Sequence, residues 1–141
     1  MMRPALLATG VCLAMALIST GATATVTLLS PSDLKWEHGN GDGPGPDSAT
    51  LREDAQTGSV EFIAHYPGGH KFQPHWHSVN ERILLLEGRL HVEAGGLKRD
   101  LVPGGYAYFP AKEVHNMACV SEGRCAFYLY WDGKTDFHVA Q

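Results

Sequence analysis

The chain has 141 residues, of which 44% are hydrophobic and 18% are charged, and its formal net charge is −4 at pH 7. This length and composition predict one globular domain with a packed core. An acidic chain without a Lys/Arg cluster lacks the basic face that nucleic acids and anionic membrane surfaces bind, so neither is an expected partner.

The first residues have the features of a secretory signal peptide. Arg3 precedes an uncharged, mostly apolar stretch over residues 5–18, and the small residues Ala22-Thr23-Ala24 follow it. This order predicts residues 1–24 as a signal peptide that is cleaved after Ala24. The apolar stretch is shorter than the roughly 20 residues that span a bilayer. We therefore expect a periplasmic or secreted protein without stable membrane association once the signal is removed.

Residues 25–58 are predicted to form an N-terminal arm and loop. Within them, residues 39–46 contain four glycines and two prolines, a composition typical of a loop.

Residues 59–141 are predicted to form an all-β domain. Short apolar or alternating runs are separated there by Gly, Pro and Asn, and no helical period is visible, a pattern typical of a sandwich or barrel. The expected strands are 59–66, 71–77, 82–86, 89–93, 98–102, 106–109, 115–120, 125–131 and 137–140.

One expected strand is apolar on both faces. It contains Ile83-Leu84-Leu85-Leu86, whereas a half-exposed antiparallel strand would alternate with polar residues. A second layer must therefore cover its outer face. A homodimer is our expectation, and coverage by the N-terminal arm would satisfy the same requirement.

A cluster of histidines and one glutamate has the spacing of a metal site. His75 and His77 lie two residues apart, so they share one face of a strand, and Glu81 can return at the start of the next strand. His115 follows Pro110 after a further turn. Three imidazoles and one carboxylate predict one divalent transition metal (Fe, Mn, Ni, Cu or Zn) rather than Mg or Ca.

These residues resemble the two motifs of the cupin superfamily, G(X)5HXH(X)3-4E(X)6G and G(X)5PXG(X)2H(X)3N. The first motif is matched at every fixed position, and the second departs from the pattern at Lys112, where the family has glycine, and at Cys119, where it has asparagine. The resemblance implies a single-domain cupin-type jelly-roll β-barrel of the small exported bacterial kind. It also implies His75, His77, Glu81 and His115 as the metal ligands. The matching residues are Gly69, His75, His77, Glu81, Gly88, Gly104, Pro110 and His115.

The remaining histidines lack the motif spacing to glycine, proline and glutamate, and we expect them at the surface or in hydrogen bonds. His70 is close enough in sequence to line the rim of a pocket. The remaining histidines are His38, His65, His70, His91 and His138.

Two cysteines remain after signal cleavage, and an exported protein can keep them oxidised. A three-residue loop, Ser121-Glu122-Gly123, would set Cys119 and Cys125 opposite each other on two strands of a hairpin. We predict a disulfide between them. The alternatives are two small core residues, or a thiolate ligand at Cys119.

The aromatic residues near the end of the barrel alternate along one strand. By resemblance, Tyr128 and Tyr130 are favoured as pocket-lining residues and catalytic candidates, whereas Phe127 and Leu129 are expected to pack in the core. Ile83 and Leu85 share the face of Glu81, which predicts an apolar pocket around the metal.

The metal and pocket predict a metal-dependent enzyme, dioxygenase-like or lyase-like, that acts on a small organic substrate bound at the metal. The alternative is a non-catalytic module that binds a metal or a small molecule, because no dedicated acid or base stands out beside the ligands.

Overall fold

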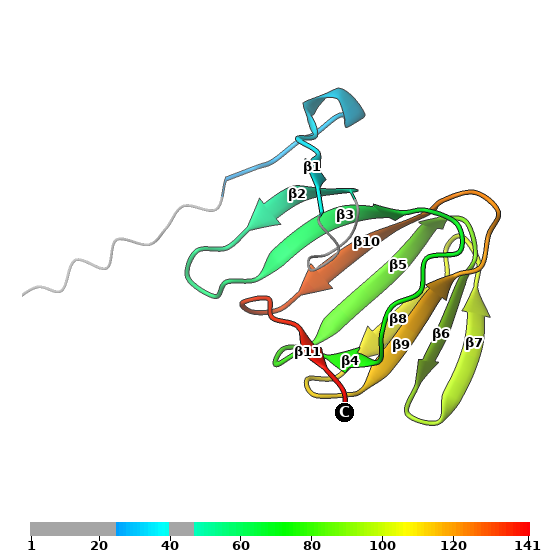
Figure 1. Ribbon diagram of the computed structural model, residues 1–141. Helices are drawn as coiled ribbons and strands as arrows, with labels where there is room; N and C mark the ends of the chain where they lie inside the picture. Colours follow the sequence, from blue (N-terminus) through cyan, green and yellow to red (C-terminus); the bar gives the residue numbers. More distant parts are fainter. Residues whose placement is uncertain (1–24, 40–46) are drawn as a thin grey trace, which may run out of the picture.

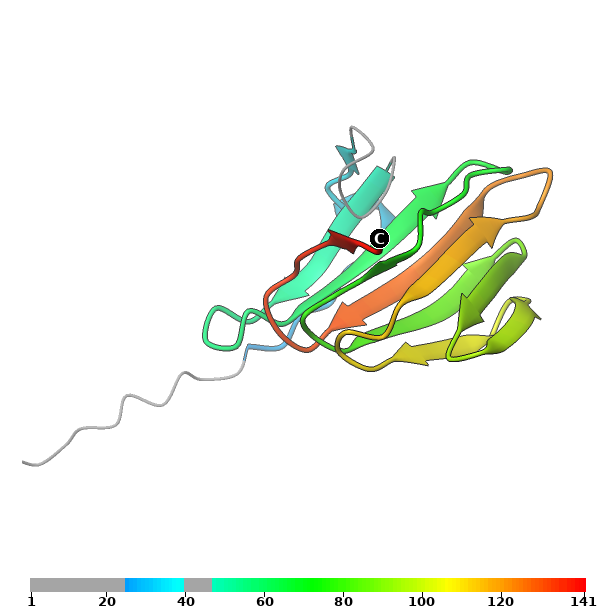
Figure 2. The same cartoon turned by 60° about the horizontal axis from the view of Figure 1, so that its bottom comes forward.

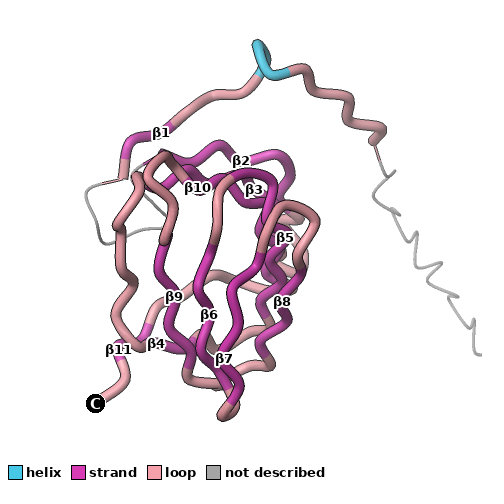
Figure 3. Tube along the Cα trace, turned by 90° about the vertical axis from the view of Figure 1, so that its right-hand side faces the viewer, coloured by secondary structure: helices cyan, strands magenta, loops and turns pink. Residues whose placement is uncertain are grey.

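The chain folds into two antiparallel sheets that face each other as a jelly roll (Figure 1). The computed structural model describes residues 25–39 and 47–141. The six-stranded sheet has the order β1-β2-β3-β10-β5-β8, and the five-stranded sheet has the order β11-β4-β9-β6-β7. Figure 2 shows the two layers from another side, and Figure 3 shows β9, β6 and β7 side by side in one of them.

The bounds of the strands follow the predicted pattern closely. Eight strands, β3 and β5 to β11, agree with the expected ranges to within one residue at each end. The six-stranded sheet contains β1 (Glu37–His38), β2 (Asp47–Glu53), β3 (Val60–Tyr66), β10 (Cys125–Trp131), β5 (Glu81–Glu87) and β8 (Tyr106–Phe109). The five-stranded sheet contains β11 (His138–Val139), β4 (His75–Trp76), β9 (His115–Cys119), β6 (Leu90–Ala94) and β7 (Leu97–Leu101), and a short 3-10 turn, η1 (Pro31–Asp33), precedes β1.

Alternation along the strands builds one core between the sheets. Phe62 on β3, Ile83 and Leu85 on β5, and Phe127 and Leu129 on β10 all point inward and are at most 3% exposed. Complete burial of one such side chain stabilises the folded state by about 1.5–3 kcal/mol. The first residue of β5, Glu81, is also buried and belongs to the polar cluster described below.

The expected arm contains strands, which is a difference from the prediction. β1 pairs with β2, and β2 pairs with β3 along most of its length. The sequence of β2 is mostly polar and buries only Ala49 among its seven residues, so it lacks the alternation that marks a strand. The pairing with β3 adds it to the sheet despite this weak pattern.

The expected strand 71–77 is mostly irregular. Lys71 forms an isolated bridge with Ala118, and regular pairing begins only at β4. The predicted signal peptide and most of the glycine-rich loop lie outside the described residues. Within the described residues, no helix has the length and apolar character needed to cross a membrane.

Candidate metal centre

Three strands bring the predicted ligands together. His75 opens β4 and His77 follows that strand directly, Glu81 opens β5, and His115 opens β9. His75 and His115 face each other in the β4–β9 pair. All four side chains are buried, with 1–3% exposure. The strand starts therefore gather three imidazoles and one carboxylate between the two sheets.

The ligand atoms converge on one point. The three histidines offer ring nitrogens that all lie within 4.8 Å of one another. The Oε2 atom of Glu81 lies 3.1 Å from Nε2 of His115 and 3.5 Å from Nε2 of His77. This convergence agrees with the spacing of the sequence motif. It includes the carboxylate as well as the three rings.

Backbone carbonyls orient all three imidazoles. In each ring Nδ1 donates to a carbonyl oxygen, which leaves Nε2 as the free nitrogen. A second hydrogen bond of this kind is usual for metal-binding histidines, because it fixes the tautomer and the ring orientation. The acceptors are Gln73 for His75 (2.7 Å), Asp136 for His77, and Glu113 for His115 (3.0 Å).

An aromatic ring packs against each of the three imidazoles. Two of these aromatic rings stack nearly parallel to a ligand ring, and a third packs at an angle. The pairs are Phe109 with His115 (ring centroids 4.0 Å apart), Phe137 with His75 (4.4 Å) and Trp131 with His77 (4.9 Å).

The polar atoms at the centre fit a metal ion. Nε2 of His77, Oε2 of Glu81 and Nε2 of His115 are buried and have no hydrogen-bond partner among the described residues. Buried polar atoms are rarely left unpaired, because desolvation without a partner is costly. Burial lowers the pKa of His75 to about 4, so its ring is neutral at pH 7 and can act as a ligand. A cation bound at this point would satisfy all these atoms.

A cavity of about 250 Å³ opens beside the ligands. Its wall is mainly apolar and aromatic, as the sequence predicted, and among the described residues it contains no Lys or Arg. Ile83 and Leu85 lie on the inward face of β5 as expected, but they pack in the core rather than in this wall. The wall consists of Tyr66, Phe72, His75, His77, Glu81, Met117, Phe127, Leu129, Trp131, Thr135, Asp136 and Phe137.

The expectation for Tyr128 and Tyr130 is wrong. β10 buries Phe127, Leu129 and Trp131, and the two tyrosines that alternate with them face outward. Burial, together with the hydrogen bond that its hydroxyl donates to the carboxylate of Glu61 (2.9 Å), raises the pKa of Tyr128 to about 12. Tyr130 packs against Arg82, whose Cζ lies 5.2 Å from the ring centroid. Neither tyrosine lines the cavity.

Two of the pocket residues that sequence reasoning missed, Tyr66 and Phe137, lie outside the motifs. Tyr66 is the tyrosine of the cavity wall, and burial followed by the charge of Glu81 raises its pKa well above the usual value. The strictly alternating sequence of β3 contained a signal for Tyr66, because Phe62, Ala64 and Tyr66 share one face. Phe137 had no such signal, because it lies in an irregular segment.

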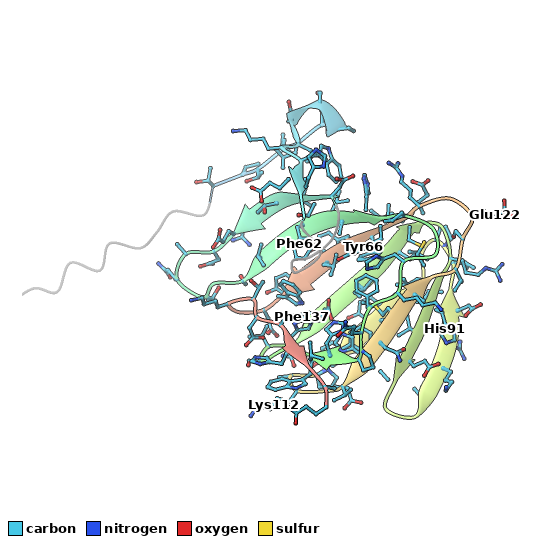
Figure 4. The ribbon with its side chains drawn as sticks, viewed as in Figure 1. Phe62, Tyr66, His91, Lys112, Glu122 and Phe137 are labelled. Atoms are coloured by element: carbon cyan, nitrogen blue, oxygen red, sulfur yellow. A yellow bond between two sulfur atoms is a disulfide. The ribbon has the colours of Figure 1, made fainter. Side chains whose placement is uncertain are left out.

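The C-terminal segment closes one side of the site (Figure 4). β11 pairs with β4, so that His138 faces Trp76 and Val139 faces His75. The amide of Ala140 donates to the carbonyl of Pro74 (2.9 Å). The carboxylate of Asp136 accepts from the amide of Ser78 (2.8 Å) and lies 3.1 Å from the ring of His138. Residues at the end of the described chain therefore hold the strand that carries two ligands.

The remaining histidines stay apart from the ligand cluster. His38 lies beside Asp47, His65 stacks on Trp36, and His91 lies between two carboxylates on the outer side of the five-stranded sheet (Figure 4). His70 packs on Tyr66 and Phe72 but does not line the cavity, unlike the expectation for the pocket rim.

The structure explains the two departures from the second motif. Lys112 keeps the left-handed conformation that the motif glycine would favour (φ 68°), and its amide donates to the carbonyl of His77 (2.7 Å). Cys119 forms a disulfide with Cys125, with Cα atoms 5.8 Å apart. The predicted disulfide is therefore confirmed, and Cys119 is no thiolate ligand.

The geometry behind that disulfide differs from the predicted hairpin. Cys119 pairs with Leu90 in the five-stranded sheet, whereas Cys125 pairs with Tyr66 in the six-stranded sheet. The bond therefore links the two sheets at the end of the barrel, and Glu122 lies at the tip of the connecting loop (Figure 4).

Solved structures with the same fold include enzymes and proteins described only by family. KdgF from Halomonas sp. is 19% identical, with a TM-score of 0.63 over 77% of this chain and 94% of that chain. DMSP lyase DddQ from Ruegeria pomeroyi DSS-3 is 16% identical, with a TM-score of 0.58 over 81% of this chain and 56% of that one. A cupin superfamily protein from Desulfitobacterium hafniense DCB-2 is 20% identical, with a TM-score of 0.53 over 61% and 75%.

At these identities the likeness shows a shared fold. Comparison with curated protein sequences yields no significant match. A family model described as the ChrR cupin-like domain matches residues 24–132. This match covers most of the sequence, including all four converging side chains, and the chain therefore belongs to the ChrR cupin-like family of the cupin superfamily.

Proposed function

We propose that this protein is an exported metal-binding cupin that acts as a metal-dependent enzyme, dioxygenase-like or lyase-like, on a small organic substrate. One observation carries the proposal. Three buried ligand atoms without hydrogen-bond partners converge beside a cavity large enough for a small molecule.

His75, His77, His115 and Glu81 would hold one divalent transition metal. A site with three nitrogens and one oxygen suits Fe, Mn, Ni, Cu or Zn better than Mg or Ca. When bound, such an ion supplies Lewis acidity toward a substrate oxygen or a place for dioxygen. The carbonyls behind the three rings would keep the imidazoles in the orientation that binding requires.

The cavity wall indicates the class of substrate. Aromatic and aliphatic side chains dominate it, and the described part of the chain places no Lys or Arg there to pair with phosphates or several carboxylates. A small neutral or singly charged organic molecule with an oxygen atom near the ligands fits this wall.

Tyr66 is the candidate for holding a proton in the cavity. A phenol is protonated at neutral pH, and burial raises the pKa of Tyr66 further, so its hydroxyl can donate a hydrogen bond but is a poor general base. Enzymes among the similar folds, such as DMSP lyases and oxalate oxidase, support a lyase or an oxidase at the level of the fold.

A non-catalytic binding module is the second candidate. Asp136 is the carboxylate of the wall besides Glu81, and it is already engaged by the amide of Ser78 and the ring of His138. The cavity then offers a metal and an apolar surface without a separate general base, which suits capture of a ligand without turnover.

Export is part of the proposal. The order of charged, apolar and small residues in 1–24 supports a cleaved signal peptide. The Cys119–Cys125 disulfide supports an oxidising destination, because such bonds rarely persist in the cytosol. N-terminal sequencing of the protein from the periplasm or medium should begin at Thr25, and recovery of the intact chain only in the cytosol would contradict export.

The metal is tested on protein purified without an affinity column that carries nickel. Elemental analysis should find about one transition-metal ion per chain. His77→Ala should lose it, whereas His38→Ala, which changes a solvent-exposed histidine outside the cluster, should retain it. Equal metal content in both variants would show that the spacing selected the wrong histidines.

Turnover is tested separately on the metal-loaded protein. Oxygen consumption and absorbance changes are followed with a panel of small phenols, diketones and carboxylic acids, beside the His77→Ala variant. Turnover that the variant lacks supports the enzyme. Tight binding of a panel member without any chemical change supports the binding module.

A further inference from the structure

A second hollow, of about 520 Å³, opens at the edge strands β7 and β8 (Figure 3). β7 is the last strand of the five-stranded sheet, and β8 is the last strand of the six-stranded sheet. We call it the edge hollow, which is lined by β6, β7 and β8 together with Gly95, Pro110 and Glu113. It shares no lining residue with the cavity beside the candidate ligands. Because small-molecule sites have volumes of about 300–1,000 Å³, the edge hollow is large enough for a ligand of its own.

The floor of the edge hollow is apolar. Val92 on β6, Leu101 on β7 and Phe109 on β8 line it, and all three belong to the core with exposures of at most 9%. The ring of Phe109 also stacks on the candidate ligand His115. Leu97, at the start of β7, lines the same hollow and is 77% exposed. A ligand that covers this leucine would therefore bury apolar surface that the chain alone leaves in water.

Arg99 lies on the inward face of β7, which is an unusual place for an arginine. It is paired in register with the core residue Val92 and therefore points to the same side of the sheet. In the part of the chain that the structure describes, its guanidinium has no ion-pair or hydrogen-bond partner. Arginine is the side chain whose geometry best matches a carboxylate. An inward charge also protects a sheet edge from aggregation, so Arg99 alone would not indicate a ligand.

Glu113 brings the opposite charge to the same hollow. Its amide donates to the carbonyl of Pro110 (3.0 Å), and its own carbonyl accepts from the ring of His115 (3.0 Å), so its backbone is held in place. Its carboxylate forms no ion pair or hydrogen bond with any residue that the structure describes. The third charged residue of the lining, Lys98, is already paired with Glu93 (2.9 Å). The edge hollow therefore presents one unpaired cation and one unpaired anion beside an apolar floor.

We propose that the edge hollow binds a free α-amino acid with an apolar side chain, such as leucine. The carboxylate of the ligand would pair with Arg99 and its ammonium group with Glu113, while its side chain would cover Val92, Leu101 and Phe109. A zwitterion matches the two opposite charges at once, whereas a simple carboxylic acid or a simple amine leaves one of them unmatched. The inference does not depend on a bound metal, because the two hollows have separate linings.

The site is tested by isothermal titration calorimetry of the purified protein with leucine and with two compounds of the same shape that each lack one charge. 4-Methylpentanoic acid lacks the amino group, and 3-methylbutylamine lacks the carboxyl group. Leucine binds to one site per chain and at least about 10-fold more tightly than either compound, because each compound loses one charge-assisted contact. A wild-type protein that shows no saturable binding of leucine at millimolar concentrations overturns the proposal. So does 4-methylpentanoic acid that binds as tightly as leucine.

Two variants assign the binding to the edge hollow. Arg99→Gln and Glu113→Gln each weaken leucine binding at least about 10-fold, with circular dichroism spectra like that of the wild type. Arg124→Gln and Glu87→Gln are the matched controls, because these two residues pair with each other (2.9 Å) outside the hollow, and both variants bind leucine like the wild type. If a variant fails to fold, the comparison of the three compounds on the wild-type protein still decides.

His77→Ala separates this site from the candidate metal centre. The variant changes a side chain of the other cavity and binds leucine as tightly as the wild type. Leucine binding that His77→Ala abolishes would place the ligand at the metal centre and overturn the proposal. Binding that survives both Arg99→Gln and Glu113→Gln would also overturn it, because the ligand would then lie elsewhere.

Discussion

Lys112 occupies a backbone conformation that suits glycine better. Its φ of 68° lies in the left-handed region, where a side chain costs about 1–2 kcal/mol, and its amide still donates to the carbonyl of the ligand His77. Lys112 thus holds the turn between β8 and β9 at a cost in stability.

Replacing Lys112 by glycine should stabilise the fold. Relief of the left-handed penalty exceeds the added entropy of the unfolded chain, so the free energy of unfolding should rise by about 0.5–1 kcal/mol. Urea unfolding at neutral pH measures the change. Lys98→Gly in β7 is the control and should lower stability, because glycine weakens a strand. If both variants lost stability, the backbone of Lys112 would not be strained.

His91 should make stability depend on pH. Hydrogen bonds to the carboxylates of Asp100 and Glu93 raise its pKa in the folded state. A raised folded pKa stabilises the protein below the unfolded pKa of about 6.5, and this contribution disappears as pH rises through the folded value.

The test compares wild-type protein with His91→Gln across pH 5 to 9. The wild-type advantage in the free energy of unfolding should be largest near pH 5 and smallest near pH 9. A constant difference over this range would show that the ion pairs do not act on stability.

At the residue scale, the convergence of the candidate ligands could be predicted, but the orientation of Tyr128 and Tyr130 could not. The spacing of His75, His77 and Glu81 indicates which side chains share a face. Along β10, in contrast, both alternating sets of side chains are apolar or aromatic, so the sequence does not indicate which set faces inward. Only the contact of β10 with β3 and β5 decides that Phe127 and Trp131 face inward and that Tyr128 faces outward.

At the scale of elements, β11 has an effect on the site that its length does not suggest. It is two residues long, yet the segment before it supplies the carbonyl behind His77 and the ring stacked on His75. No periodicity marks so short a strand, so the sequence showed its presence but not its position beside the ligands.

Phe137→Ala should weaken metal binding. Loss of the ring frees His75, and changes in the residues that support a ligand typically cost 10-fold to 100-fold in affinity. Competition with a chromophoric chelator measures the affinity. Val139→Ala changes an exposed side chain of the same segment, 54% exposed, and should leave it unchanged. Equal metal affinity in the two variants would show that Phe137 does not support the binding histidine.

At the scale of the whole molecule, the disulfide joins the two sheets. The prediction of the bond was correct although its premise of a β9–β10 hairpin was wrong, because β9 and β10 belong to different sheets. A short loop brings two cysteines together in either arrangement, so the spacing could predict the bond but not the topology.

Removing the disulfide should destabilise the fold by a modest amount. The loop that it closes is short, with a sequence separation of 6, so the chain-entropy model gives about 2 kcal/mol for the double variant Cys119→Ala/Cys125→Ala. Urea unfolding with and without reductant measures it, and reductant should affect only the wild type. Two titratable thiols in the denatured, unreduced protein would contradict the bond.

The sequence separation between the C-terminal segment and the histidine that it orients would determine when a metal could bind during synthesis. His77 and the Asp136 carbonyl that orients it are separated by 59 residues. A chain that emerges from its N-terminus at about 5–20 residues per second exposes the first three ligands seconds before His115 and Asp136 exist. At the proposed metal site, ion loading would therefore follow synthesis of the C-terminal segment, and the compartment in which β11 pairs with β4 would decide which metal binds.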